Sequence, residues 1–206
     1  ELKELAKDEV DVFMTKHDFK AINVTIPYKQ TVIPYLDFIA DEAKEIGAVN
    51  TIVNKDGKLY GYNTDFFGMK SLIERTGIVI ENKTVAILGG GGTAKTAESV
   101  SKSLGAKVIY KVSRSSKENF ITYDELYNIS DTIDVIINTT PVGMYPETGV
   151  SPVILSDFRQ VEAVFDLIYN PSKTKLLQDA ETLKIPAFNG LPMLVAQAKK
   201  SAEIFC

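Results

Sequence analysis

In the second half of the chain, short apolar runs alternate with amphipathic stretches of helical period. The run VAIL at positions 85–88 precedes a glycine cluster, which is typical of a buried strand. Thr122 and Glu125 have the spacing of a capping box that opens a short helix. This alternation predicts a parallel sheet with helices on both faces, a Rossmann-type doubly wound lobe. The predicted strands are 84–88, 107–112, 135–138, 163–167 and 185–188, and the other predicted helices are 93–104, 153–158, 172–183 and 191–204.

The first part of the chain has a different pattern. Apolar residues at positions 2, 5, 10 and 13 predict a helix over 2–14, the alternation in 21–26 predicts a strand, and 28–36 predicts a helix disturbed by Pro34. Segments 49–53 and 59–62 flank Asp56 and Gly57, which predicts a hairpin, and 65–75 predicts a helix. We therefore expect an α/β protein of two lobes. The expected domains are a substrate-binding catalytic domain of 1–65 plus 190–206 and a Rossmann domain of 66–189.

Composition removes several classes of chemistry. The 206 residues include one His and one Cys, which are too few for a His/Cys metal site or an internal disulfide. Lys plus Arg is 23 and Asp plus Glu is 27, a net charge of -4, which argues against a nucleic-acid or anionic-membrane binder. The apolar runs are too short to span a bilayer. We expect a cytoplasmic protein, a monomer or homodimer, whose acid–base groups are Lys, Asp, Glu or Tyr and which needs no metal.

A glycine-rich turn follows the strand at 84–88. Its residues match G-x-G-x-x-A between a strand and a helix, the pattern that binds the pyrophosphate of a dinucleotide. The free N–H groups at the helix start bind the phosphate charge, whereas a flexible linker is the alternative interpretation. The residues concerned are Gly89, Gly90, Gly91, Gly92, Thr93 and Ala94, followed by Lys95, which adds positive charge.

The end of the next strand indicates which dinucleotide binds. A site for NAD usually has an acidic residue there to hold the ribose hydroxyl. This chain has Ser113, Arg114 and Ser115 instead. A guanidinium flanked by hydroxyls suits a 2′-phosphate, so the pattern favours NADP, although an Arg at a strand end is often only solvated.

Several polar residues are candidates for the chemistry. Lys29 follows a strand at a sharp turn and is a possible proton donor, or a solvated surface lysine. Asp65 opens a helix and is either a catalytic group or a favourable charge at the helix N-terminus. Asn50 starts a strand and Gln197 lies on the last helix, and spacing alone leaves the roles of both open.

Taken together and in order, a series of segments resembles the shikimate dehydrogenase family. The resemblance implies NADPH-dependent reversible reduction of 3-dehydroshikimate to shikimate, a step in aromatic amino acid biosynthesis. The segments are 23–29 (NVTIPYK), 47–51 (GAVNT), 61–65 (GYNTD), the glycine-rich turn, 138–144 (NTTPVGM), 166–171 (DLIYNP) and 189–197 (NGLPMLVAQ).

The resemblance also implies roles for single residues. It makes Lys29 and Asp65 the catalytic pair, and adds Thr25, Asn50 and Gln197 as substrate-binding residues. Thr140, Tyr169 and Gly190 would line the cofactor site, the last two near the nicotinamide.

The sequence departs from the family at its start. A Ser-x-Ser motif and about one βαβ unit of roughly 30 residues are missing, so we expect an incomplete substrate lobe, with weak substrate binding or misfolding, and an intact NADP lobe. Two alternatives stay open. One is a quinate/shikimate dehydrogenase-like enzyme with another polyol acid or with NAD, and the other is a truncated, non-catalytic NADP-binding module.

Overall fold

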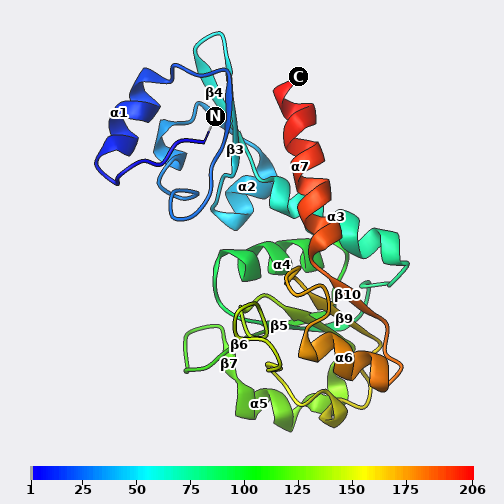
Figure 1. Cartoon of the computed structure of the whole chain (residues 1–206). Helices are drawn as coiled ribbons and strands as arrows, with labels where there is room; N and C mark the ends of the chain where they lie inside the picture. Colours follow the sequence, from blue (N-terminus) through cyan, green and yellow to red (C-terminus); the bar gives the residue numbers. More distant parts are fainter. Residues whose placement is uncertain (1) are drawn as a thin grey trace.

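The computed structural model describes residues 2–206 and has two lobes, each built on its own sheet (Figure 1). In the first lobe the strand order is β1-β3-β4-β2. The β1–β3 and β3–β4 pairs are antiparallel and the β4–β2 pair is parallel. Val10, Met14, Ile52 and Leu59 are at most 3% exposed and belong to its core. The elements are α1 (Glu9–Lys16), β1 (Ala21–Asn23), η1 (Ile33–Tyr35), β2 (Phe38–Ile39), α2 (Asp41–Ile46), β3 (Thr51–Lys55) and β4 (Lys58–Tyr62).

The second lobe is a fully parallel, six-stranded sheet with the order β10-β9-β8-β5-β6-β7. The chain runs outward from β5 to β7 and then returns to β8 and continues to β10. This reversal is the doubly wound order, with its switch point between β5 and β8. Its elements are β5 (Thr84–Leu88), α4 (Gly92–Ser103), β6 (Val108–Ser113), β7 (Ile121–Thr122), α5 (Tyr123–Asn128), η2 (Ser130–Thr132), β8 (Val135–Asn138), η3 (Leu155–Asp157), β9 (Ala163–Asp166), α6 (Lys175–Thr182) and β10 (Ala187–Asn189). The predicted α/β class with a Rossmann-type lobe is confirmed.

Alternate residues of these strands enter two separate cores. Ala86, Leu88 and Ile136 pack on one face with α5 and α6, while Val85 and Ile87 pack on the other with α3 and α4. Burial on both faces explains why the strands read as continuous apolar runs in the sequence.

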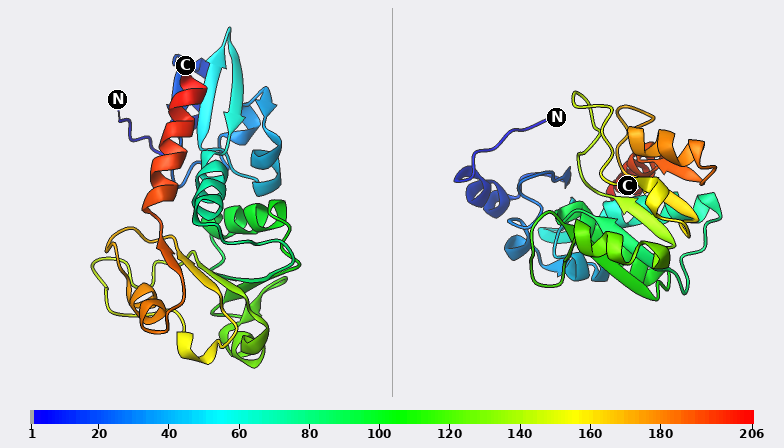
Figure 2. Two further views of the ribbon diagram at one scale, coloured as in Figure 1. Left: turned by 90° about the vertical axis from the view of Figure 1, so that its right-hand side faces the viewer. Right: turned by 90° about the horizontal axis from the view of Figure 1, so that it is seen from below.

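Two long helices run between the lobes, α3 (Thr64–Thr76) and α7 (Leu191–Phe205) (Figures 1 and 2). They approach closely at Gly68, where an added Cβ would lie 2.6 Å from the Met193 carbonyl oxygen and 2.9 Å from Gln197 Cβ. Only glycine allows this crossing without displacement. It fixes α7 against the start of α3.

The first lobe differs most from the sequence-based expectation. The helix predicted over 2–14 begins only at Glu9, because the preceding residues pack little; Leu2 is 99% exposed. The helix predicted over 28–36 is a series of turns with a short 3-10 helix around Pro34, which lacks the N–H that a longer helix needs. Both β2 and α2 were not predicted.

In the second lobe, the helix predicted over 153–158 is only the three-residue η3. Val153, Leu155 and Phe158 are buried there, so their spacing reflects packing of an irregular segment rather than a helix. Strand β7 is two residues long and was missed. Within residues 2–206, no helix combines the length and apolar character required to cross a bilayer.

Candidate active site

An ion pair joins a turn of the first lobe to the start of α3. Lys29 Nζ donates to Asp65 Oδ2 at 2.6 Å, and the two side chains keep 28% and 23% of their exposure. The turn that carries Lys29 is fixed because its carbonyl accepts the Val49 N–H at 2.8 Å. Asp65 lies in the first turn of α3, whose N-cap Asn63 accepts the Phe66 N–H. The structure therefore brings the two predicted catalytic residues into direct contact at an accessible position.

Two predicted substrate-binding amides both contact Thr64, the residue before Asp65. Asn50 Oδ1 accepts the backbone N–H of Thr64 at 2.8 Å, and the Thr64 hydroxyl lies 3.3 Å from Gln197 Oε1. Since Thr64 directly precedes Asp65, the ion pair and both amides share the start of α3. Thr64 was not predicted as part of the site, although it lies inside the segment 61–65.

Thr25, the third predicted substrate-binding residue, is exposed and follows β1. The neighbouring Val24 N–H donates to the Asn50 carbonyl at 2.8 Å, and the Thr25 carbonyl accepts the Tyr28 N–H at 2.9 Å. Among residues 2–206, the Thr25 hydroxyl has no hydrogen-bond partner, so the structure places it near Asn50 but not in contact with the other predicted residues.

The glycine-rich turn links β5 to α4, as predicted. Gly89 has a φ of +116°, and a Cβ there would lie 2.6 Å from Thr139 Oγ1, so only glycine fits. Space is open around Gly91 and Gly92, where a Cβ would meet nothing within 4 Å. The N-cap, Gly91, provides no side-chain hydrogen bond to the first N–H groups of α4. These groups form an open anion-binding surface that fits a pyrophosphate.

At the end of β6 the polar residues are arranged around a turn. The Ser113 hydroxyl donates to the Ser115 carbonyl at 2.7 Å and accepts the Ser115 N–H at 3.3 Å, which shapes the loop. Arg114 is exposed, and no carboxylate within residues 2–206 forms an ion pair with it. An unpaired guanidinium beside hydroxyls fits a 2′-phosphate.

Lys117 is a further cation that sequence reasoning did not select. Its Nζ lies 3.0 Å from the position a Gly90 Cβ would take, and 4.9 Å from the Phe120 ring centroid. Lys111 also faces this ring but is paired with Glu98 at 2.9 Å. Lys117 therefore adds positive charge directly beside the glycine-rich turn. Only the folding of the loop after β6 reveals this proximity.

The ends of β8 and β9 are joined by a buried network around Asp166, which is 0% exposed. Asp166 accepts from Asn138 Nδ2 at 3.0 Å, from the Thr174 hydroxyl at 2.5 Å and from the Ile168 N–H at 3.2 Å. Burial raises the pKa of the Asp166 carboxyl, and these hydrogen bonds oppose that rise only in part. Asn138 Oδ1 in turn accepts from the Thr140 hydroxyl at 2.7 Å.

This network supports the loops that carry the remaining predicted cofactor residues. Thr140 follows β8, and Tyr169, 53% exposed, follows β9. Gly190 follows β10, and its N–H donates to the Ile168 carbonyl at 3.0 Å. A Cβ at Gly190 would lie 2.0 Å from the Leu167 carbonyl oxygen, so the start of α7 lies directly against the loop after β9. All three residues lie at the carboxyl edge of the parallel sheet, where ligands bind in this architecture.

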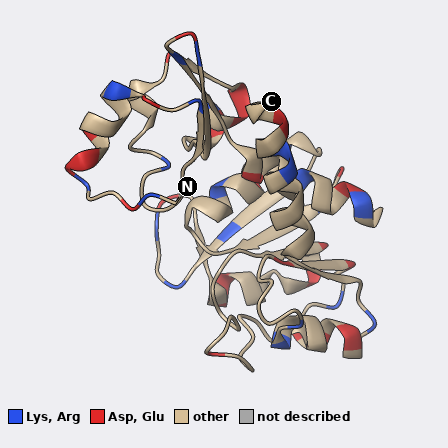
Figure 3. Ribbon diagram, turned by 45° about the horizontal axis from the view of Figure 1, so that its top comes forward, with Lys and Arg blue, Asp and Glu red and all other residues tan. Residues whose placement is uncertain are grey.

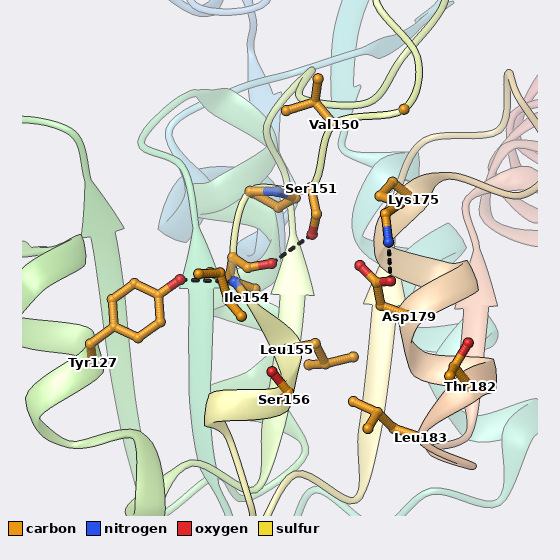
Figure 4. A pocket seen from close by; sticks show the side chains of 13 residues that line it. Tyr127, Val150, Ser151, Ile154, Leu155, Ser156, Lys175, Asp179, Thr182 and Leu183 are labelled. Atoms are coloured by element: carbon orange, nitrogen blue, oxygen red, sulfur yellow. Dashed lines mark hydrogen bonds and ion pairs between the residues drawn. The ribbon is translucent and has the colours of Figure 1, made fainter.

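A separate hollow of about 620 Å³ in the second lobe contains none of these residues (Figure 4). Its polar groups are already paired: the Tyr127 hydroxyl accepts the Ile154 N–H at 2.8 Å, and Lys175 contacts Asp179. We assign it no role.

Figure 3 shows Lys and Arg interspersed with Asp and Glu over both lobes. No group of three His, Cys, Asp or Glu within residues 2–206 is placed to hold a metal ion.

A family model described as the shikimate dehydrogenase substrate binding domain matches residues 2–52. Shikimate dehydrogenase (NADP(+)) from Clostridium beijerinckii is 45% identical over 195 residues, which cover 90% of this chain and 72% of that enzyme.

Two solved structures share the fold. A chorismate mutase/shikimate 5-dehydrogenase fusion protein from Clostridium acetobutylicum is 38% identical with a TM-score of 0.90, covering 99% of this chain and 78% of that one. Shikimate 5-dehydrogenase from Listeria monocytogenes, solved with shikimate and NAD, is 29% identical with a TM-score of 0.85, covering 98% and 79%.

Proposed function

The chain belongs to the shikimate dehydrogenase family, and from this premise we propose that it catalyses the NADP-dependent, reversible reduction of 3-dehydroshikimate to shikimate in aromatic amino acid biosynthesis. The observation that carries the proposal is the contact between Lys29 and Asp65 beside the amides of Asn50 and Gln197. It combines a proton donor, its carboxylate partner and hydrogen-bonding groups for a polyol ring.

We propose that residues 1–65 plus 190–206 form the substrate-binding catalytic domain and that 66–189 form the Rossmann domain. Helix α7 supports this division because it starts beside the second sheet at Gly190 and contacts Thr51 of β3 through Ser201. Helix α3 leads the chain in the other direction, from the first lobe at Thr64 to the second lobe.

The Lys29–Asp65 pair handles the proton in this mechanism. When bound, NADPH supplies the hydride that reduces the ring carbonyl. Lys29, as an ammonium, stabilises the negative charge that develops on the carbonyl oxygen and transfers a proton from Nζ to that oxygen. Asp65 Oδ2 holds Nζ in place at 2.6 Å and stabilises its charge. In the reverse direction, Lys29 accepts the hydroxyl proton.

The substrate's other oxygens bind to Thr25, Asn50 and Gln197 in this proposal. Asn50 is 5% exposed and held by Thr64, so it offers a preorganised contact. Thr25 is exposed and has to be ordered by the ligand.

The cofactor is held along the carboxyl edge of the second sheet. The first N–H groups of α4 and the open turn at Gly91 and Gly92 receive the pyrophosphate. Ser113, Arg114 and Ser115 receive the 2′-phosphate. We assign the nicotinamide end to the group formed by Thr140, Tyr169 and Gly190, with Gly89, Gly90, Thr93, Ala94 and Lys95 completing the turn.

The direct test is a spectrophotometric assay of nicotinamide reduction by the full chain with shikimate and NADP, repeated with NAD and with quinate. The proposal predicts turnover with shikimate and NADP and much less with either replacement. Preference for quinate or NAD would support the dehydrogenase-like alternative. Cofactor binding without turnover of any substrate would support the non-catalytic module.

We further propose a cytoplasmic monomer or homodimer whose ligands are small molecules.

A further inference from the structure

Three buried hydroxyls lie beneath the amides of Asn50 and Gln197. The Ser201 hydroxyl is 3.0 Å from the Thr51 hydroxyl and 3.1 Å from the Thr64 hydroxyl. Thr51 and Thr64 are 0% exposed and Ser201 is 2% exposed. This hydroxyl cluster, defined as Thr51, Thr64 and Ser201, joins the start of β3, the start of α3 and the C-terminal half of α7.

The Thr64 backbone N–H fixes which way the Asn50 amide points, and the Thr51 hydroxyl of the cluster donates to the same amide oxygen. Asn50 Oδ1 accepts the Thr64 N–H at 2.8 Å and lies 3.1 Å from the Thr51 hydroxyl. A backbone N–H can only donate, so the oxygen of the amide has to face it. Asn50 Nδ2 points the other way and has no hydrogen-bond partner among residues 2–206. It is not one of the fully enclosed polar atoms without a partner, so it keeps some surface on the side away from Thr64.

The Gln197 amide faces a hydroxyl instead of a backbone N–H, so its orientation depends on the direction in which the Thr64 hydroxyl proton points. Its Oε1 is 3.3 Å from the Thr64 hydroxyl, while its Nε2 has no partner within the described part of the chain. Ser201 lies one helical turn beyond Gln197, on the same face of α7. When the Ser201 hydroxyl donates to the oxygen of Thr64, the Thr64 proton is directed to an amide oxygen and its hydrogen bond is strengthened.

We propose that Ser201 and Thr51 are positioning residues, which hold the amides of Asn50 and Gln197 with their oxygens inward and their NH₂ groups toward the substrate. The site then selects ring oxygens that accept hydrogen bonds, such as hydroxyl and carbonyl oxygens. This inference rests on the proposed function for the identity of the substrate, but the amide orientation does not depend on it.

The test compares two variants that remove a hydroxyl with two matched controls. Ser201→Ala and Thr51→Val delete cluster hydroxyls with little change of shape. Thr51→Ser keeps the hydroxyl and loses only a methyl group. Ser99→Ala deletes a hydroxyl that is similarly buried, at 3% exposure, but has no hydrogen-bond partner among residues 2–206.

Steady-state kinetics of the full chain give the first readout. Losing one buried hydrogen bond weakens the dependent interaction about fivefold. We therefore expect Ser201→Ala and Thr51→Val to raise the KM for shikimate by about fivefold, with kcat and the KM for NADP close to wild type. Ser99→Ala and Thr51→Ser should retain the wild-type KM for shikimate. Equal effects of Ser201→Ala and Ser99→Ala, or a matching rise in the KM for NADP, would overturn the proposal.

The second readout does not require activity. The side-chain NH₂ signals of Asn50 and Gln197 in ¹⁵N–¹H spectra should shift in Ser201→Ala and stay in place in Ser99→Ala. Unmoved signals in Ser201→Ala would overturn the positioning role. If the wild-type chain does not oxidise shikimate, the proposed function fails, and these spectra alone decide the inference.

Discussion

Replacing Gly68 by alanine would place a methyl group in the crossing of α3 and α7. Gly68 lies inside a helix, where alanine is favoured by about 1 kcal/mol if nothing touches the new methyl. Here the methyl carbon would lie 2.6 Å from the Met193 carbonyl oxygen and 2.9 Å from Gln197 Cβ. Carbon and oxygen atoms approach to about 3.3 Å even in favourable contacts, so α7 has to move by roughly 0.7 Å.

Two opposing terms decide the sign of the Gly68→Ala effect. Overpacking of this kind costs about 1–3 kcal/mol, which exceeds the helix-propensity gain of about 1 kcal/mol. We expect a net loss of about 1 kcal/mol in the free energy of unfolding, measured by urea denaturation with circular dichroism. Because Gln197 moves with α7, the KM for shikimate should rise.

Gly92 provides the matched control for stability. It also lies in a helix, but a Cβ there would meet nothing within 4 Å. Gly92→Ala should therefore leave the free energy of unfolding unchanged or raise it by up to about 1 kcal/mol. If Gly68→Ala were as stable as Gly92→Ala and kept the wild-type KM for shikimate, the close packing of α7 on α3 would not position Gln197.

Two further predictions concern the second lobe. Burial raises the pKa of Asp166 above its ordinary 3.8. The contribution of Asp166 to the free energy of unfolding is therefore complete below pH 3.8 and is lost as the pH rises through the folded-state pKa. The unfolding free energy of wild type relative to Asp166→Asn should therefore fall over this range in urea titrations, and a constant or rising difference would contradict the argument. Arg114→Ala should raise the KM for NADP by about 10- to 100-fold through loss of charged hydrogen bonds and leave the KM for NAD unchanged; equal changes for both cofactors would refute a 2′-phosphate contact.

The second lobe was predictable because local pattern and final structure agree there. Strand β5 has the predicted bounds, since its residues are buried on both faces and end at a glycine turn. The capping box also forms: the Thr122 N–H donates to Glu125 Oε2 at 2.6 Å, and Thr122 Oγ1 accepts the Glu125 N–H at 3.3 Å. Both features depend on neighbours in sequence.

The first lobe and the details of the site depend on distant contacts. The hydroxyl cluster joins Thr51 to Ser201, 150 positions apart, and no local pattern marks either residue. Lys117 reaches Gly90 only through the fold of an irregular loop. Helix α2 is six residues long, too short to produce a clear apolar period. The pairing of Lys29 with Asp65 followed from the family resemblance and not from their spacing in the chain.

The central claim is that Lys29 transfers the proton while Asp65 holds the Lys29 ammonium group in place. The kcat of Lys29→Ala tests this claim most directly. Shikimate oxidation with NADP should be measured with both substrates saturating, alongside the dissociation constant for shikimate. The account predicts a fall in kcat of about 100- to 10,000-fold with a much smaller change in shikimate binding. A kcat equal to that of the wild type would contradict it.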